Sequence, residues 1–414
     1  MDKDSRNIAT ESPVLLGEAW FDAIEMGIRD QIRGFIEALV DEELNEALGR
    51  ARYERPAGAD AVAETVGYRH GRRDRQLLGS FGPVTISLPR ARLRDADGRR
   101  QEWRSNVLPR YARMTKQLEA LIAGAYLSGT NTRRVRRALA ALFKGAVSKD
   151  TVSRVWRRVQ ADWQAWCRRS LVDDDVVRLV LDGTVVRVRL DRKATSISLL
   201  VVLGIRRDGQ KILLAVRNMG GESEAAWRSL LDDLVSRGLK APEFIIIDGA
   251  AGLEKPLGLV WPKALVQRCT VHKHRNLLAH APERLHEEVS ADYNDMIYAK
   301  TAKEIETRRK SFLRKWRLKC RAVADSLEEA RDRLFTFTRL PESQWRSART
   351  TNAIERLHEE FKRRIKTQTV LPSAETAAML FWALLASGQI TMRKVDGWQT
   401  LSRPPSIQCI DLAA

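Results

Sequence analysis

Residues 176–184 read VVRLVLDGT, a short apolar run that ends in the carboxylate of Asp182. The same design recurs downstream, where residues 244–247 read FIII and Asp248 follows. A continuous apolar run of this length is typical of a strand that is buried on both faces of a sheet. A third carboxylate, Glu355, lies in the basic segment TTNAIERLHEEFKRR of residues 350–364. We interpret the three acids as the ligands of one divalent-metal site.

The size and charge of the chain indicate what kind of partner it has. Its 414 residues, with a hydrophobic fraction of 44%, are enough for two or three domains with real cores. The formal net charge of +19 on a folded, non-repetitive chain points to a polyanion, most often nucleic acid. A merely basic soluble protein is the alternative, and a high arginine content would also follow from a GC-rich genome.

The spacing of the cysteines and the lack of long apolar runs bear on the cellular compartment in which the protein is expected. Cys167, Cys269, Cys320 and Cys409 are scattered without the spacing of a small disulfide scaffold, which fits a reducing cytosol. The first residues, MDKDSRNIATES, are polar and unlike a signal peptide. No apolar run approaches the length of about 20 residues that a membrane span needs. We therefore expect a cytoplasmic protein with no membrane partner.

The N-terminal region, residues 1–109, combines a predicted helix with a small β element. Apolar residues recur at helical spacing over residues 14–51, and a linker rich in Pro, Gly and Ala follows at residues 55–64. Residues 84–88 then alternate as in a strand, with arginines on both sides. We expect the helix to serve packing or dimerisation. The β element fits contact with a DNA backbone and a solvated surface equally well.

Residues 110–170 carry a strong excess of basic side chains on predicted helices, with thirteen lysines and arginines against three acids between residues 110 and 168. A glycine-containing turn precedes Ser148, the expected N-cap of a helix that turns Val152 and Val155 inward. Helix, short turn and capped basic helix are the parts of a helix-turn-helix module, whose second helix enters the major groove of DNA. A structural helical hairpin is the alternative. The candidate DNA contacts in this region are Arg133, Arg134, Lys149, Arg154, Arg157 and Arg158.

Past residue 170 the apolar period changes from that of a helix to that of strands. Antiparallel strands, then a helix, then a buried strand describe an α/β sheet of the ribonuclease H-like kind, in which Asp182 and Asp248 lie close together at strand ends. The expected elements of residues 171–275 are strands at 176–181, 185–190, 196–205, 211–216 and 244–247, a helix at 222–239 and an apolar run at 264–266.

Three acids of this kind suit phosphodiester chemistry. Cleavage needs a nucleophilic oxygen and a stabilised leaving oxygen, and two magnesium ions about 3.5–4 Å apart supply both. Magnesium is a hard ion that prefers carboxylate oxygen and water, whereas Cys and His ligands suit zinc. We therefore expect Mg²⁺, with Mn²⁺ as a substitute, on Asp182, Asp248 and Glu355.

Each acid also has an ordinary structural explanation. An Asp-Gly pair after a strand is a common turn, which would account for Asp182 and Asp248. Asn352 and Glu355 match a helix capping box, in which the glutamate binds a backbone N–H. The rival third ligands on the same segment are Glu359 and Glu360.

Five motifs occur together in an order and spacing that are specific to one family. They are LDGT at residues 181–184, GESEAAW at 221–227, IIDGAAGL at 246–253, QRCTVHKHRNL at 267–277 and TTNAIERLHEEFKRR at 350–364. Through them the chain resembles the bacterial insertion-sequence transposases of the Mutator-like group, which are of the DDE type. The resemblance runs from about residue 14 to about residue 395, and it implies a catalytic triad of Asp182, Asp248 and Glu355.

The resemblance also implies an architecture. A ribonuclease H-like α/β core would be interrupted by an all-helical insertion and preceded by a mainly helical DNA-binding region with a small β element. The core would comprise residues 171–275 and, with the third acid, residues 347–395. The insertion would comprise residues 276–346, as a clamp on DNA or as a structural cover. Residues 396–414 would form a C-terminal tail.

The implied activity is DNA transposition. The protein would bind the terminal inverted repeats of its element in double-stranded DNA, hydrolyse a phosphodiester to free a 3′-hydroxyl, and direct that hydroxyl at target DNA. Acting on two ends implies a homodimer or a larger homo-oligomer, at the bacterial nucleoid. A glycoside hydrolase also pairs carboxylates, but the basic helices and an aromatic content of 7% argue against it. The other alternative is a non-catalytic helix-turn-helix regulator derived from a transposase, against which the intact acids argue.

A Cys-x-x-His pair, Cys269 and His272, would lie near the active site by the same resemblance. We expect His272 to position the scissile phosphate or to form hydrogen bonds near the metals, with core packing as the alternative. Structural zinc is disfavoured because no second pair follows at zinc-finger spacing. His358 stands where the family more often has Asn. The remaining candidate DNA contacts are Lys273, Arg275, Arg356, Lys362 and Arg363.

Overall fold

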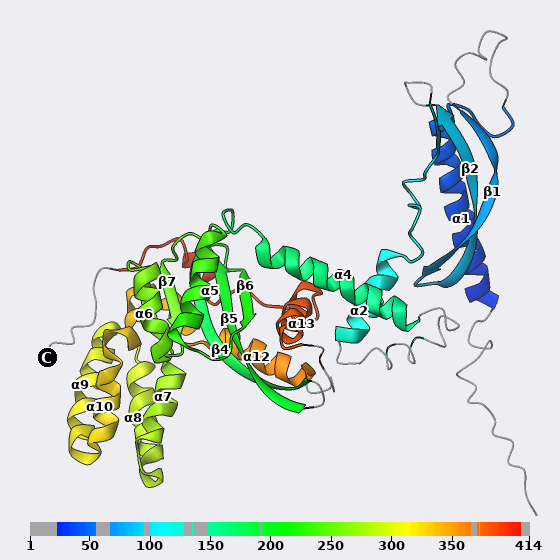
Figure 1. Cartoon of the computed structure of the whole chain (residues 1–414). Helices are drawn as coiled ribbons and strands as arrows, with labels where there is room; N and C mark the ends of the chain where they lie inside the picture. Colours follow the sequence, from blue (N-terminus) through cyan, green and yellow to red (C-terminus); the bar gives the residue numbers. More distant parts are fainter. Residues whose placement is uncertain are drawn as a thin grey trace, which may run out of the picture. The chain divides into compact units, whose positions relative to one another are not determined.

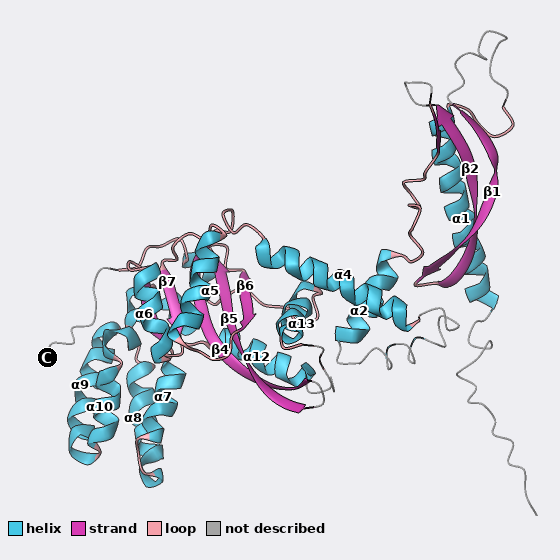
Figure 2. Ribbon diagram, viewed as in Figure 1, coloured by secondary structure: helices cyan, strands magenta, loops and turns pink. Residues whose placement is uncertain are grey.

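The computed structural model describes residues 23–54, 67–94, 99–127, 135, 139, 148–190, 193–365, 371 and 373–406. The described chain is a mixed α/β structure with one sheet of three strands and one of five (Figures 1 and 2). It divides into two compact units, Met1–Tyr126 with Thr130–Arg158, and Leu127–Gly129 with Val159–Ala414. Among the described residues, no helix combines the length and the apolar character that a membrane crossing requires.

The first unit contains a helix packed against a small antiparallel sheet. Val40 of α1 and Ile86 of β2 are buried in one apolar cluster, and the predicted helix is confirmed over its described part. Residues 84–88 alternate into this core as predicted. The hairpin turn lies between Gly79 and Gly82, which pair with each other at the ends of the two strands. The elements are α1 (Ala23–Leu48), β1 (Gly67–Gly79), β2 (Gly82–Arg94) and β3 (Arg100–Glu102).

The basic helical region belongs largely to the same unit. Ser148 caps a helix as predicted, since its Oγ accepts a hydrogen bond from the backbone N of Thr151 at 3.1 Å. Val152 and Val155 are buried, as their spacing predicted. The described elements are α2 (Lys116–Leu127), α4 (Lys149–Arg168) and the buried helical residues Val135 and Leu139.

The second unit contains the five-stranded sheet, in the order β6-β5-β4-β7-β8. β4, β5 and β6 are antiparallel neighbours, whereas β7 and β8 run parallel to β4. A sheet of this composition needs helical connections to its parallel strands, and the chain supplies them before β7 and before β8. The strands are β4 (Val176–Leu190), β5 (Lys193–Arg206), β6 (Lys211–Asn218), β7 (Phe244–Ile247) and β8 (Leu265–Arg268).

The prediction of two separate strands within residues 176–190 is wrong. β4 runs through this segment without a break, and Asp182 and Gly183 pair with Val201 and Leu200 of β5. The Asp-Gly pair does not turn the chain here, because the ladder with β5 already satisfies its backbone groups.

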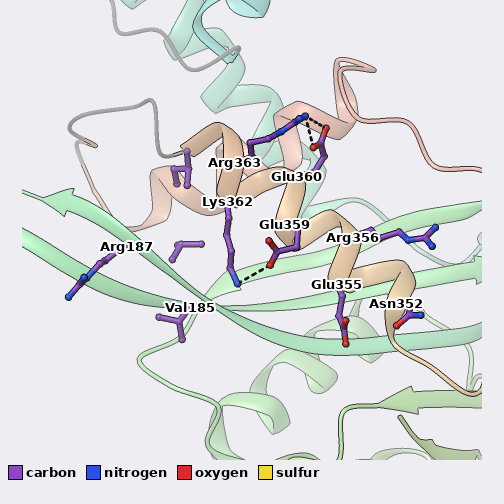
Figure 3. A pocket seen from close by; sticks show the side chains of 11 residues that line it. Val185, Arg187, Asn352, Glu355, Arg356, Glu359, Glu360, Lys362 and Arg363 are labelled. Carbon is purple, nitrogen blue, oxygen red and sulfur yellow. Dashed lines mark hydrogen bonds and ion pairs between the residues drawn. The ribbon is translucent and has the colours of Figure 1, made fainter. Parts of the chain in front are cut away.

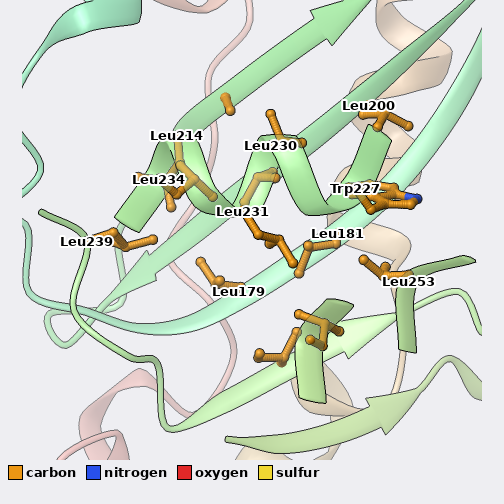
Figure 4. Close-up of a cluster of buried hydrophobic side chains, with 14 of the residues drawn as sticks. Leu179, Leu181, Leu200, Leu214, Trp227, Leu230, Leu231, Leu234, Leu239 and Leu253 are labelled. Atoms are coloured by element: carbon orange, nitrogen blue, oxygen red, sulfur yellow. The ribbon is translucent and has the colours of Figure 1, made fainter. Parts of the chain in front are cut away.

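Two helices cover one face of this sheet. Leu179 and Leu181 of β4 and Ile245 and Ile247 of β7 lie in a buried cluster with α5 and α6 (Figure 4). Side chains alternate along a strand, so Val180 and Asp182 face the opposite side. There α12 (Asn352–Ile365) contacts β4, and α13 (Glu375–Ala386) contacts β6. The predicted inner face of α5 (Glu224–Ser236) is confirmed, with Ala226, Trp227, Leu230, Leu231 and Leu234 buried; α6 spans Ala251–Val260.

Between β8 and α12 the described chain is helical. Four of these helices, α7 to α10, pack on one another (Figure 1). The first begins at Thr270 rather than near residue 276, because Lys273 already donates its backbone N–H to Cys269. The helices are interrupted near Pro282 and Pro341, at residues 298–301 and at Cys320. The helices are α7 (Thr270–Ala279), α8 (His286–Ile297), α9 (Ala302–Lys319), α10 (Arg321–Glu329) and α11 (Glu342–Ala348).

Candidate metal-dependent active site

Asp182 and Asp248 lie at the same edge of the five-stranded sheet. The residues before them, Leu181 and Ile247, are partners in the parallel ladder between β4 and β7. An oxygen of Asp248 accepts a hydrogen bond from the backbone N of Ala250 at 2.8 Å, which fixes the carboxylate at the strand end. Burial, together with the negative charge of Asp182, raises the pKa of Asp248. Two carboxylates that repel each other at one sheet edge favour a bound cation between them.

Asp182 has a partner on the helix that contacts its strand. Nδ1 of His358, on α12, lies 3.3 Å from Oδ2 of Asp182, and the two side chains are only 5% and 7% exposed. The other ring nitrogen of His358 is buried without a partner among the described residues. The imidazole therefore makes its one polar contact with Asp182.

Glu355 reaches the site from the first turn of α12. Its Oε1 accepts a hydrogen bond from Oγ1 of Thr351 at 3.1 Å and lies 3.5 Å from Nδ1 of His272. Its Oε2 lies 3.9 Å from the guanidinium of Arg275. Two of these contacts cross from α12 to α7, which goes beyond the local bond of a capping box.

The Cys-x-x-His pair lies where β8 gives way to α7. Sγ of the fully buried Cys269 accepts hydrogen bonds from the backbone N (3.4 Å) and Oγ1 (3.2 Å) of Thr351. The hydrogen bond to Cys269 and the negative charges of Cys269, Glu355 and Asp182 raise the pKa of His272 to about 9, against the effect of burial. The same imidazole partly opposes the rise in the pKa of Asp248 that burial causes. His358, one turn after Glu355 on α12, contacts Asp182, so this helix brings the third acid to the same side of β4 as the first.

Two sets of metal donors meet in this region. Within the described residues, Cys269, His272 and Glu355 are the one group of three whose ligand atoms all lie within 4.8 Å of one another. Asp182, Asp248 and Glu355 are spaced more widely than that. The mixed set suits a softer ion such as zinc, but its sulfur and imidazole already bind each other and Thr351. The all-oxygen set suits magnesium, and a pair of ions about 3.5–4 Å apart needs its acids spaced around both ions.

A groove lies beside Glu355, between β4 and the outer side of α12 (Figure 3). Arg187 of β4 and Arg356 of α12 line it, and neither has a hydrogen bond or an ion pair with any described residue. An unpaired guanidinium is free to bind phosphate oxygens without first losing another partner. The groove therefore offers two available cations next to the third acid.

The remaining cations of the groove are already paired. Lys362 lies 3.7 Å from Glu359, and Arg363 lies 2.7 Å from Glu360, as the dashed lines in Figure 3 mark. The two rival third acids are thus engaged by neighbours one turn away on α12. Glu355 alone of the three points toward α7 and its histidine.

Not every basic residue singled out in the sequence is available for DNA. Arg275 is 62% exposed beside Glu355. Lys273, by contrast, is buried, and its Nζ donates hydrogen bonds to the carbonyl of Ser326 and to Glu329, both at 2.8 Å. We conclude that Lys273 stabilises the α7–α10 contact instead of facing solvent.

The helix-turn-helix candidates belong to the first unit. Arg154, Arg157 and Arg158 are exposed on α4, and Arg158 pairs with Glu119. Lys149 is the first residue of that helix. Arg133 and Arg134 lie outside the described residues.

Comparison with known proteins identifies the family. The model of the family described as "Transposase, Mutator family" matches residues 10–392. The chain belongs to the Mutator family of transposases. It is 31% identical over 358 residues to the transposase for insertion sequence element ISRM5 of Rhizobium meliloti (strain 1021), with 86% of each chain covered. It is 28% identical over 368 residues to the transposase for element IS256 in transposon Tn4001 of Staphylococcus aureus, with 87% of this chain and 91% of the relative covered. The resemblance inferred from the five motifs is confirmed.

One acidic residue of the transposase was not predicted from the sequence as part of the site. Glu222 lies in the GESEAAW motif, which indicated the family and no chemistry. Burial, and then the charges of Asp248 and Asp182, raise its pKa, while His272 opposes them. The Glu222 carboxylate lies against Gly183, the residue after Asp182, where an added Cβ atom would overlap it. The only sequence signal was a second acid within the motif, and Glu224 has the same residue type two positions later.

Proposed function

We propose that this transposase uses Asp182, Asp248 and Glu355 to cleave DNA at the ends of its insertion sequence and to transfer the freed ends to target DNA. The convergence of three acids that are distant in the sequence carries the proposal. Asp182 lies within β4 just past its last ladder partner in β7, Asp248 follows β7, and the third acid lies on the helix that contacts β4. The charge of His272 interacts with all three. Acids gathered in this way suit metal-assisted phosphodiester chemistry.

We propose a ribonuclease H-like core with an inserted helical region. The strand order, three antiparallel strands followed by two parallel ones, supports the first part. The helices α7 to α11, which lie between the second and third acids, support the second. In the domain scheme that we propose, residues 171–275 and 347–395 form the core, 276–346 the insertion, whose start falls within α7, and 396–414 the tail.

The cation that we propose is Mg²⁺, with Mn²⁺ as a substitute, because an all-oxygen donor set suits hard ions. When bound, such a cation would promote deprotonation of the attacking water or hydroxyl and would stabilise the negative charge on the leaving oxygen. The chain's own residues orient the ligands. His358 holds Asp182, a backbone N–H holds Asp248, and Thr351 holds Glu355.

The DNA strand that is cut would follow the groove beside Glu355. Arg187 and Arg356 line this groove without partners in the described chain, and the exposed Arg275 lies beside Glu355. Contacts of arginine with phosphate oxygens would place the scissile phosphate over the acids. Lys362 and Arg363 would join after release from their glutamates.

Recognition of the terminal inverted repeats is assigned to residues 110–170. The exposed arginines of α4 support this assignment, because a basic recognition helix enters the major groove. Residues 1–109 would bind the element ends or mediate dimerisation. Two ends must be processed together, so we propose a homodimer or larger assembly that acts on DNA in the cytoplasm, at the nucleoid.

The test is cleavage of a labelled duplex that carries one end of the element. Asp182→Asn, Asp248→Asn and Glu355→Gln should each reduce Mg²⁺-dependent nicking to background, while binding of the same duplex without metal is retained. Glu359→Gln, on the same helix, is the matched control and should nick normally. Nicking at the wild-type rate by the Asp182 variant would refute the triad. A wild-type protein that binds the duplex but never nicks it would indicate the non-catalytic regulator instead.

A further inference from the structure

Glu222 is placed at the sheet edge by the segment that enters α5. The next residue, Ser223, caps that helix, since its Oγ accepts a hydrogen bond from the backbone N of Ala226 at 3.2 Å. A capped helix that is buried through Trp227 and Leu230 holds its first turn in place. The position of Glu222 is thus fixed by the core beneath it.

Two glycines make room for Glu222. A Cβ atom on Gly183, the residue after Asp182, would overlap the Glu222 carboxylate. A Cβ atom on Gly252 would lie 2.6 Å from the backbone oxygen of Glu222, a distance that real contacts do not reach. Glycine at both positions lets this segment pack closely against β4 and the start of α6. The carboxylate consequently lies over Gly183, the residue after Asp182, on the α5 side of β4.

The surroundings of Glu222 are unusual for an acid. It is half-buried, and it has no hydrogen bond or ion pair to its carboxylate among the described residues. Its charged neighbours are Asp182 and Asp248, with His272 as the opposing charge. Glu224, two residues later, has an ordinary arrangement, with its Oε1 2.9 Å from Nζ of Lys255. Burial and the neighbouring negative charges destabilise the ionised form of such a carboxylate, unless a cation neutralises the negative charges.

We propose that Glu222 is a fourth acid of the cation site, which contributes a carboxylate oxygen to the divalent ion held by Asp182 and Asp248. The inference rests on the proposed function, because it assumes that these aspartates bind a cation. The ligand class is a hard divalent ion, Mg²⁺ or Mn²⁺, for which a further oxygen donor increases affinity. Glu222 would act from the α5 side of β4, whereas Glu355 acts from the α12 side. The site would then be closed from both faces of the sheet.

Binding of Mn²⁺ to the full-length transposase, followed by electron paramagnetic resonance of the free ion, tests the proposal. Glu222→Gln keeps the shape of the side chain and removes its charge, so it should weaken Mn²⁺ binding by about tenfold or more. Gly183→Ala leaves every acid in the sequence but displaces the Glu222 carboxylate, so it should weaken binding similarly. The double variant should be no weaker than the worse of the two single variants. Nicking should require correspondingly more Mn²⁺ in each case.

Two controls separate this inference from the proposed function. Glu224→Gln removes a nearby charge outside the site and should bind Mn²⁺ like the wild type, and Asp182→Asn should lose binding. If Asp182→Asn loses binding while Glu222→Gln and Gly183→Ala stay within twofold of the wild type, Glu222 is not part of the site. If none of the variants, Asp182→Asn included, changes Mn²⁺ binding, the metal site of the proposed function is itself refuted. Circular dichroism verifies that each variant is folded.

Discussion

The imidazole of His358 holds the carboxylate of Asp182 at 3.3 Å inside the protein, across the contact between α12 and β4. This pair links the helix that carries the third acid to the strand that carries the first. The ring also packs edge-on against Phe381 of α13, with the ring centroids 6.1 Å apart. The position of the first acid therefore depends on a residue that is not itself an acid.

Removal of the His358 ring should impair cleavage without removing any acid. His358→Ala leaves a buried carboxylate without its partner, so we expect nicking to fall by about 10- to 100-fold. The free energy of unfolding should fall by about 2 kcal/mol, measured by urea denaturation. His358→Asn keeps a donor near Asp182 and should recover part of the activity. An alanine variant with full activity would show that the pair is dispensable.

The groove beside Glu355 predicts a ranking of basic residues in DNA binding. Arg187→Ala and Arg356→Ala each remove a guanidinium that has no partner among the described residues. Affinity should therefore fall, and the slope of log K against log salt should decrease by about 1 for each phosphate that is no longer neutralised. Fluorescence anisotropy at several salt concentrations measures both quantities. Lys362→Ala and Arg363→Ala are matched controls on the same helix, with smaller expected effects because their charges are already paired. Equal reductions in affinity at all four positions would contradict this path for the DNA.

Cys269 should matter as a hydrogen-bond acceptor at the start of α12. Cys269→Ala leaves the backbone N and the Oγ1 of Thr351 without their buried acceptor, which should cost about 2 kcal/mol of unfolding free energy. Cys269→Ser supplies an oxygen acceptor and should be destabilised less. Cys320→Ala, at a half-buried cysteine that follows α9, should be nearly neutral in the same urea titration. If a zinc chelator destabilised the wild type as much as Cys269→Ala does, a metal would be the true partner of this thiol.

The stability of the α7–α10 contact should depend on pH through Glu329. Burial acts against its ionisation, but Arg268 and the buried Lys273 outweigh this effect and lower the pKa of Glu329 to about 2 from an ordinary 4.5. An acid whose pKa is depressed contributes stability above its unfolded pKa, and that contribution disappears as the pH falls from 4.5 through about 2.

Urea midpoints at pH 7, 4 and 3 measure this effect. Glu329→Gln should be less stable than the wild type by about 1 kcal/mol at pH 7, a modest value because the carboxylate is 59% exposed and solvent screens the pair. The difference should shrink at pH 3. Glu328→Gln, at the half-buried neighbour that pairs with Arg317 instead, should show a smaller difference at pH 7. A gap between Glu329→Gln and the wild type that stays constant down to pH 3 would argue against this ion pair.

Much of the second unit was readable from local sequence. Continuous apolar runs predicted β7 and most of β4, and helical spacing predicted the inner face of α5. These elements are predictable because burial of one or two faces requires apolar residues at regular positions along the segment. The three acids were visible for the same reason, as carboxylates at the ends of such runs or within the family motifs. The break predicted inside β4 was wrong because an Asp-Gly pair looks the same whether it turns or continues in a ladder.

Only the tertiary structure decided which residues surround those acids. The strand order puts β4 beside β7, and this pairing joins Asp182 to Asp248 across more than sixty residues of chain. Glu222, His358 and Arg187 come to the same region from a loop, a helix and a strand face, and Lys273 is turned inward although its neighbours look equally basic. Contacts between segments distant in the sequence depend on packing, which periodicity along one segment does not encode. The types of the functional residues could therefore be read from the sequence. Their positions relative to one another are determined by the packing of the helices against the sheet.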